Sequence, residues 1–195
     1  GDFDDCQKLV KEAFLDKALC AKYALTSANS INIGRLLPQM TYYAFSSYKL
    51  FSQSQTPINF VIPSGNMGNG MAAVWAKEMG LPIGEIHFAC NANRAIFDFF
   101  QNKKFTARDS FKTLANAMDV GNPSNMERLL DLEKRRPSVL GDLSASWHSD
   151  EKIRSVILDY FQKKNKIVCP HTAVALAAGE RFSSESMVVS VATAH

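Results

Sequence analysis

Long apolar runs, paired cysteines and an excess of charge are all scarce in this sequence. No run of about 18 apolar residues is present, so we expect no membrane span. The acidic start has no signal-peptide core, and the 4 cysteines form no Cys-x-x-Cys pair. We therefore expect reduced, mostly buried thiols in a cytoplasmic protein. A net charge of +3 is too small to predict nucleic-acid binding, and the 4 scattered histidines form no tight metal cluster.

What the chain does contain is a regular alternation of strand and helix patterns. An apolar run at 58–62 precedes a helical pattern at 71–79, and a strand pattern at 85–90 precedes a helical pattern at 94–101. This order is typical of βαβ units with a parallel sheet. We predict an α/β fold, three-layered and doubly wound around a mainly parallel sheet. The whole chain, 1–195, is expected to be one domain, with 105–147 as an irregular insertion or subdomain.

Further elements follow from capping residues and apolar spacing. In chain order we expect a first helix capped by Asp4, with Cys6, Leu9, Val10 and Ala13 on one apolar face; a strand at 23–28; and a helix capped by Ser30 that contains Pro38 and ends near Leu50. Next come Asn93 as a cap, a Ser124 to Glu127 capping box, a loop at 137–146, a helix at 150–164 capped by Ser149, a strand at 167–168, a helix beginning near Pro170, and a strand at 187–192.

The most informative stretch is the glycine-rich turn at 63–70, between an expected strand and an expected helix. Glycines permit a positive φ and close approach of a ligand to the backbone. The start of the following helix offers unpaired amides to an anion such as phosphate. The glycines at 65, 68 and 70 match neither the Walker nor the dinucleotide-binding pattern. The residues alone leave open a plain strand-to-helix turn that binds nothing.

A second polar set, Asn29, Ser30 and Arg35, lies at another expected helix start. Taken alone, these residues are explained first by helix capping and a surface arginine. In a parallel α/β sheet, however, the loops after the strands lie along one edge. We therefore expect the loops at 29–35, 64–70 and 91–93 to lie along the same edge of the sheet.

Several stretches resemble the threonine synthases, in the order in which that family carries them. They are Phe3-Asp4-Asp5-Cys6-Gln7, Asn29-Ser30-Ile31-Asn32, Ser64-Gly65-Asn66-Met67-Gly68-Asn69, Ala117-Met118-Asp119, Pro123-Ser124-Asn125-Met126-Glu127-Arg128-Leu129, Pro170-His171-Thr172-Ala173-Val174 and Thr193-Ala194-His195. Threonine synthase is a pyridoxal-phosphate (PLP) enzyme of fold type II, the fold of the tryptophan synthase β subunit. The resemblance implies conversion of O-phospho-L-homoserine and water to L-threonine and phosphate, with PLP as the cofactor.

The resemblance also implies roles for individual residues. The cofactor phosphate is expected on a loop that acts mainly through backbone amides, Ser64, Gly65, Met67, Gly68 and Asn69. Asn66 is expected between cofactor and substrate phosphate, and the substrate-phosphate clamp is expected to be Asn29, Ser30 and Arg35. Thr193 resembles the hydroxyl that faces the pyridine nitrogen, whereas His171 and Asp119 lie in family-like motifs without an assigned role.

Two departures from the family bear on function. Cys169 stands where members usually carry an acidic residue before Pro-His-Thr. The PLP lysine of the family lies upstream of the matched stretches, so we expect no catalytic residue in this chain and no turnover without the missing N-terminal part. Two rivals remain: a threonine synthase-like phospholyase or another fold-type II PLP lyase, and a non-catalytic phosphate-binding module.

Overall fold

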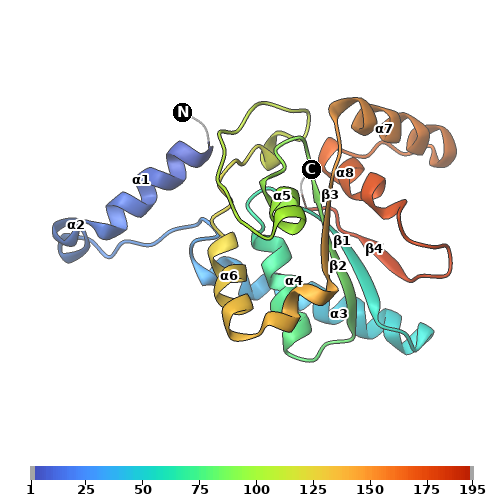
Figure 1. Ribbon diagram of the computed structural model, residues 1–195, viewed down its shortest axis with the longest axis horizontal. Helices are drawn as coiled ribbons and strands as arrows, with labels where there is room; N and C mark the ends of the chain where they lie inside the picture. Colours follow the sequence, from blue (N-terminus) through green and yellow to red (C-terminus); the bar gives the residue numbers. More distant parts are fainter. Residues whose placement is uncertain (1–2, 194–195) are drawn as a thin grey trace.

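A parallel β-sheet organises the chain in the computed structural model, which describes residues 3–193 (Figure 1). The strand order is β3-β2-β1-β4, and every neighbouring pair is parallel. The strands are β1 (Ile58–Pro63), β2 (Ile83–Cys90), β3 (Leu143–Trp147) and β4 (Val188–Ser190). The helices are α1 (Phe3–Leu15), α2 (Lys17–Lys22), α3 (Leu37–Ser54), α4 (Gly68–Glu78), α5 (Ala95–Asn102), α6 (Met126–Arg135), α7 (Asp150–Lys164) and α8 (Pro170–Gly179), with 3₁₀ turns at Ile33–Arg35, Asn116–Met118 and Pro137–Asp142.

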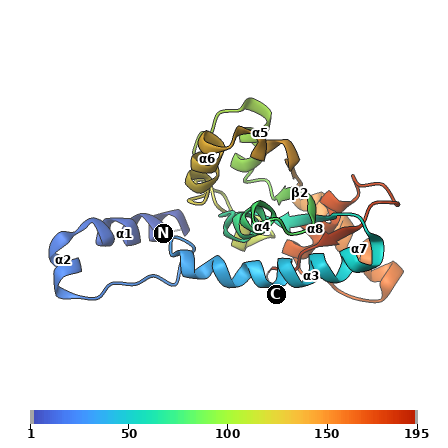
Figure 2. The same cartoon turned by 90° about the horizontal axis from the view of Figure 1, so that it is seen from below.

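Both faces of the sheet are covered, and alternate residues of each strand point to opposite faces. Phe60 and Phe88 pack with core residues of α3, α4, α5 and α6. Val61 and Ala89 pack with α7 and α8 on the other face. The central strand β1 is buried along nearly its whole length, as expected of a parallel strand covered on both sides (Figure 2). The prediction of a three-layer, doubly wound α/β fold is therefore confirmed.

The strand order contains a reversal that positions the site. The chain proceeds from β1 to β2 and β3 toward one edge of the sheet. It then returns through α7 and α8 and adds β4 on the opposite side of β1. In open α/β sheets, ligands bind outside the carboxyl ends of the strands at such a reversal. The loops after β1 and β4, at 64–70 and 191–193, therefore begin at the favoured place.

Several local predictions are confirmed. Pro38 lies in the first turn of α3, where its missing amide costs nothing. The Ser149 side chain caps α7 by accepting a hydrogen bond from the backbone amide of Lys152. Pro170 begins α8.

Other predictions are wrong. Residues 23–28 and 167–168 form no strand, because nothing in the described chain pairs with them. The second half of the expected loop at 137–146 belongs instead to strand β3. Its serines conceal the strand pattern, and they are accommodated because His87 on β2 bonds both Ser144 and Ser146. Treating 105–147 as an insertion or subdomain stays a prediction.

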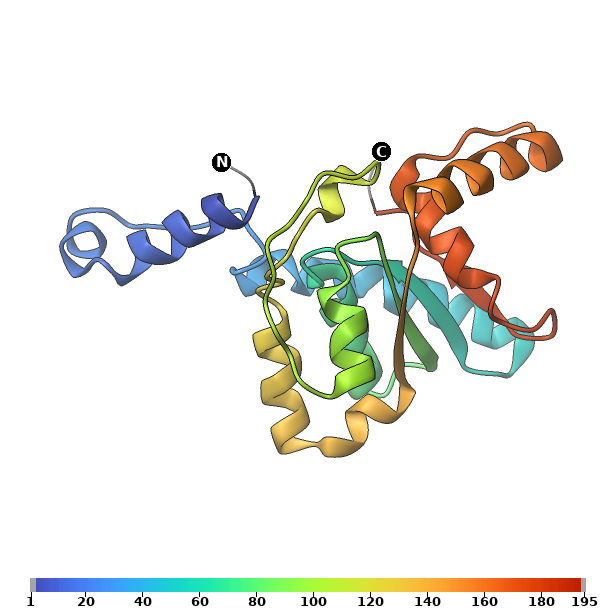
Figure 3. The same ribbon diagram turned by 45° about the horizontal axis from the view of Figure 1, so that its top comes forward.

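The N-terminal helices α1 and α2 extend away from the sheet, while the long connection from α5 to α6 loops back beside α5 (Figure 3). The expected apolar face of α1 is not buried: Leu9 is 65% exposed, and Gln7 is the buried residue of that helix. Asp4 lies inside α1 rather than capping it, and its Oδ2 accepts a hydrogen bond from the Gly121 amide, 3.0 Å away.

The expectation of mostly buried thiols is wrong for half of the cysteines. Cys6 and Cys20 are exposed, Cys90 is buried and Cys169 is half-buried. Among residues 3–193, no helix is long and apolar enough to cross a membrane. The cytoplasmic location stays a prediction.

Candidate functional site: two anion-binding loops in one cleft

The turn after β1 presents a row of unpaired amides. No backbone amide from Gly65 to Gly70 finds a hydrogen-bond partner within the described residues. The helix α4 begins at Gly68, and Met67 at its N-cap has no side-chain oxygen to accept from these amides. Because free amides and the positive end of the helix dipole coincide here, the turn is suited to bind an anion.

The glycines of this turn serve close packing more than unusual dihedral angles. A Cβ on Gly65 would lie 2.6 Å from the Cα of Met118, and a Cβ on Gly68 would lie 3.0 Å from the Cβ of Ser30. The positive φ that we expected at a glycine belongs to Met67, at 61°. Met67 is only 2% exposed, so burial of its side chain offsets the cost of the left-handed backbone.

The second polar set lies on a turn before α3. Ser30 does not cap that helix: Asn32 caps a 3₁₀ turn at Ile33–Arg35, accepting from the Gly34 amide at 2.9 Å. The Asn29 side-chain oxygen accepts hydrogen bonds from Ser30 Oγ, at 3.2 Å, and from the Ile31 amide. Arg35 is exposed, and none of the ion pairs among the described residues includes it.

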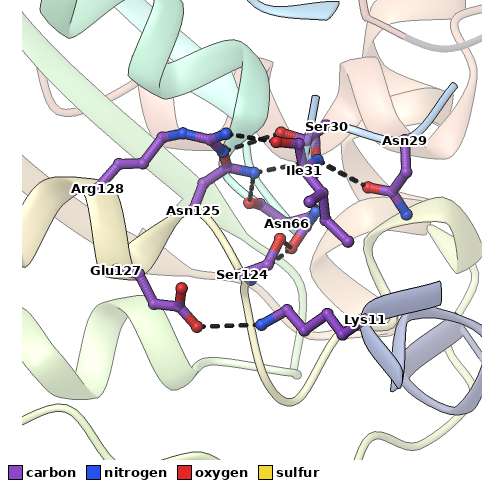
Figure 4. A network of polar contacts seen from close by, with 9 residues as sticks. All are labelled: Lys11, Asn29, Ser30, Ile31, Asn66, Ser124, Asn125, Glu127 and Arg128. Carbon is purple, nitrogen blue, oxygen red and sulfur yellow. Dashed lines mark hydrogen bonds and ion pairs between the residues drawn. The ribbon is translucent and has the colours of Figure 1, made fainter. Parts of the chain in front are cut away.

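The two polar sets share one cleft of about 380 Å³. Asn66 bridges them directly, since its Nδ2 donates to Ser30 Oγ at 2.6 Å (Figure 4). No aspartate, glutamate or lysine lines the cleft within the described residues. Its lining residues are Phe3, Ala28, Asn29, Ser30, Arg35, Gln39, Pro63, Gly65, Asn66, Met67, Gly68, Asn69, Ala117, Met118, His171 and Thr193. The cleft thus combines an arginine and a helix start without an opposing carboxylate.

Not every expected site residue faces this cleft. Ser64 is 3% exposed, its Oγ donates to the Ile62 carbonyl at 2.9 Å, and it does not line the cleft. Asn69 lines the cleft, but its side chain bonds to α3, including the Gln39 Oε1 at 2.8 Å and the hydroxyl of Tyr43. Asn69 therefore offers a ligand its backbone amide. Thr193 lines the cleft, whereas Ala194 and His195 of the same motif lie outside the described residues.

The loop that packs on Gly65 is held by Asp119. This carboxylate accepts hydrogen bonds from the side chains of Asn91, Asn93 and Thr113 at 2.7–3.0 Å. We expected Asn93 to cap α5, but its side chain instead donates hydrogen bonds to Asp119 and to the Phe111 carbonyl and so joins two loops. The geometry gives Asp119 a structural role.

His171 supports the same loop from α8. Its Nε2 accepts a hydrogen bond from the Ala117 amide at 3.1 Å, so the neutral ring carries its proton on Nδ1. That Nδ1 is buried and has no partner among the described residues. Burial lowers the pKa of His171, partly opposed by the charge of Asp119. His171 therefore stays neutral near pH 7 and keeps this acceptor available.

Sequence reasoning missed three residues behind the cleft. The expected capping box is wrong, because Ser124 donates from its amide, at 2.7 Å, and from its Oγ, at 3.0 Å, to Asn66 Oδ1. Asn125 and Arg128 bond to Ser30 as well. The motif was visible, but contacts between residues so far apart in sequence have no local signature.

Distant structural matches establish the class of fold. Threonine deaminase isoform 2 from Solanum lycopersicum and maize serine racemase superimpose with TM-scores of 0.57 and 0.53, each at 15% identity, covering 82% and 77% of this chain and 43% and 46% of theirs. The chain has the parallel α/β fold of the fold-type II PLP-dependent enzymes. Within that class, it is homologous to the threonine synthases. No family model matches it.

The homology to the threonine synthases rests on relatives of 30% identity or more. The threonine synthase of Buchnera aphidicola (from Acyrthosiphon pisum) is 40% identical over 176 residues, 90% of this chain and 41% of that protein. The Escherichia coli threonine synthase structure gives a TM-score of 0.89 at 34% identity, over 96% of this chain and 44% of that one. A PLP-bound threonine synthase from Brucella melitensis gives 0.85 at 30%, over 100% and 47%. The chain thus spans less than half the length of these proteins.

Proposed function

We propose that this chain is the phosphate-binding portion of a threonine synthase, the PLP enzyme that forms L-threonine and phosphate from O-phospho-L-homoserine and water. The observation that carries the proposal is the single cleft shared by the amides of 65–70 and the turn at 29–35. A cofactor phosphate and a substrate phosphate are both dianions. They suit a cleft lined by free amides and Arg35 without a carboxylate.

Each wall of the cleft has its own task in this proposal. The free amides from Gly65 to Gly70 hold the PLP phosphate, and the Thr193 hydroxyl is the partner of the ring nitrogen. Arg35 and the side-chain amide of Asn29 hold the substrate phosphate, with Asn66 between the two phosphates. When bound, PLP supplies the electron-withdrawing ring that the reaction requires.

The PLP-binding lysine is proposed to come from outside this chain. The support is that no lysine lines the cleft within residues 3–193. The isolated chain is then expected to bind PLP reversibly and to show no turnover. Incubation with PLP and borohydride, followed by peptide mass analysis, tests this. A reduced PLP adduct on a single lysine of this chain, together with release of phosphate from phosphohomoserine, would contradict the lysine assignment.

The substrate assignment is tested at Arg35 in the complete enzyme. Replacing Arg35 by Met removes a charged contact worth roughly 1.5–3 kcal/mol, so the KM for phosphohomoserine is expected to rise about 10- to 150-fold. Arg154, exposed on α7, provides the matched control, and Arg154→Met should leave KM unchanged. Serine is the comparison substrate. Turnover of serine in preference to phosphohomoserine would favour a different PLP lyase, and PLP binding without turnover of either would favour a binding module.

A further inference from the structure

A polar latch at the start of α6 joins the two walls of the cleft. Its members are Asn125 and Arg128, which reach the turn at 29–31 and the turn at 65–67 from behind (Figure 4). We propose that Arg128, supported by Asn125, is a positioning residue that fixes the substrate-phosphate clamp against the cofactor loop. This inference rests on the proposed function.

The guanidinium of Arg128 donates hydrogen bonds to two successive backbone carbonyls. Its Nη1 donates to the Ser30 carbonyl at 2.9 Å, and its Nη2 donates to the Ile31 carbonyl at 2.7 Å. A planar guanidinium makes two such contacts in a fixed geometry, which a flexible ammonium cannot reproduce. The peptide planes between Ser30 and Ile31 and between Ile31 and Asn32 are therefore held in one orientation, directly after the clamp residues Asn29 and Ser30.

Asn125 connects the same turn to the cofactor loop by hydrogen bonds. It is fully buried, and its Nδ2 donates to Ser30 Oγ at 3.0 Å and to the Asn66 carbonyl at 2.8 Å. Its side-chain oxygen accepts from Arg128 Nη1, so the arginine also orients the amide. One pair of side chains thereby sets the spacing between a clamp residue and a cofactor-loop residue.

In the part of the chain that the structure describes, the guanidinium of Arg128 binds backbone carbonyls and not a carboxylate. No carboxylate forms an ion pair with it among the described residues, and its neighbour Glu127 pairs instead with Lys11 at 3.0 Å. The guanidinium lies 6.0 Å from the centre of the Trp75 ring on α4, a cation–π contact. Arg128 is therefore held by the carbonyls of the turn at 29–31 and by an aromatic ring on α4.

The cofactor loop has supports that do not involve Arg128. Gly65 packs on Met118, and Met67 is anchored in the core. Loss of Arg128 should therefore disturb the clamp more than the cofactor loop. For Arg128→Met in the complete enzyme we expect the KM for phosphohomoserine to rise 10- to 100-fold. PLP content should be unchanged, and kcat should fall less than threefold.

Two controls sharpen this test. Arg128→Lys keeps one donor and should recover part of the lost affinity. Arg135→Met removes an exposed arginine from the same helix and should behave as wild type. Wild-type KM in Arg128→Met, or an equal loss of PLP, would overturn the positioning role.

Amide hydrogen exchange separates this inference from the proposed function. Arg128→Met should speed exchange at residues 30–36 and leave the amides of α4 as they are in wild type. If the wild-type enzyme fails to use phosphohomoserine, the proposed function fails, and the exchange pattern still decides whether Arg128 positions the clamp. Uniform exchange changes, or none at 30–36, would overturn the inference.

Discussion

Acidification should destabilise this fold through a buried histidine on the sheet. His87 on β2 is 1% exposed and lies on the face covered by α7 and α8. Its Nδ1 lies 2.6 Å from Ser144 Oγ and its Nε2 lies 2.8 Å from Ser146 Oγ, and Ser146 Oγ lies 3.1 Å from His148 Nε2. The neutral ring satisfies one serine as donor and the other as acceptor, so protonation would disturb the chain of hydrogen bonds.

Burial lowers the pKa of His87 from 6.5 to about 4, and the nearby charge of Arg181 acts in the same direction. Glu85 opposes this, and His148 adds a small lowering effect. Because the pKa is lower in the folded state, the unfolded chain binds the extra proton between pH 6.5 and pH 4. Stability is therefore retained above pH 6.5 and lost as pH falls, by about 2 kcal/mol at pH 5 and about 3 kcal/mol at pH 4.

Urea unfolding at several pH values between 7 and 4 measures this effect. Carboxylates also contribute to acid sensitivity, so the comparison is with His87→Gln, which keeps a donor and an acceptor but does not titrate. The variant should be less stable than wild type at pH 7, and the difference should shrink by about 3 kcal/mol by pH 4. A difference that is independent of pH, or an imidazole NMR titration of His87 centred near 6.5, would refute the reasoning.

Two further predictions concern backbone contacts and a helix cap. Gly65→Ala places a methyl group 2.6 Å from the Met118 Cα, so it should lower the free energy of unfolding in urea by about 1–3 kcal/mol and weaken PLP binding. Gly141 has open space around it, so the control Gly141→Ala should change the free energy of unfolding by no more than about 0.5 kcal/mol. Cys169 caps α8 through its sulfur, which lies 3.4 Å from the Thr172 amide. Because a carboxylate is a stronger cap, Cys169→Asp should raise the free energy of unfolding in urea by about 1 kcal/mol. An unchanged or lower free energy of unfolding would refute the capping argument.

The sequence predicted those elements whose signals are local. The apolar run of β1, the Ser149 cap and Pro170 at the start of α8 depend on neighbours within a few residues, and all three occur as expected. The glycine-rich turn and the turn at 29–35 share one cleft, although the turn at 29–35 does not follow a strand as expected. The reversal of strand order beside β1 accounts for the loop after β1 and for Thr193 after β4, whereas the turn at 29–35 is brought to the cleft by tertiary contacts such as the Asn66–Ser30 hydrogen bond.

The wrong capping predictions share one physical cause. Ser30, Asn93 and Ser124 are of residue types that often cap helices, yet the side chain of each forms a hydrogen bond with a residue far away in the sequence. The partner is Asn66 for Ser30 and Ser124, and Asp119 for Asn93. Short polar side chains choose between local and tertiary hydrogen bonds, and propensity describes only the local choice. The sequence therefore predicted which polar residues would line one cleft, but not which of them would be engaged in tertiary hydrogen bonds.

The cleft is assembled from opposite ends of the described chain, since Asn29 and Thr193 both line it. It is complete only after the last strand, β4, has docked against β1. A molecule bound there thus recognises the finished fold alone, and its binding energy is added to that of the whole sheet. With PLP as the proposed occupant, the supply of vitamin B6 would govern how long such a protein survives heat or proteolysis, apart from any effect on catalysis.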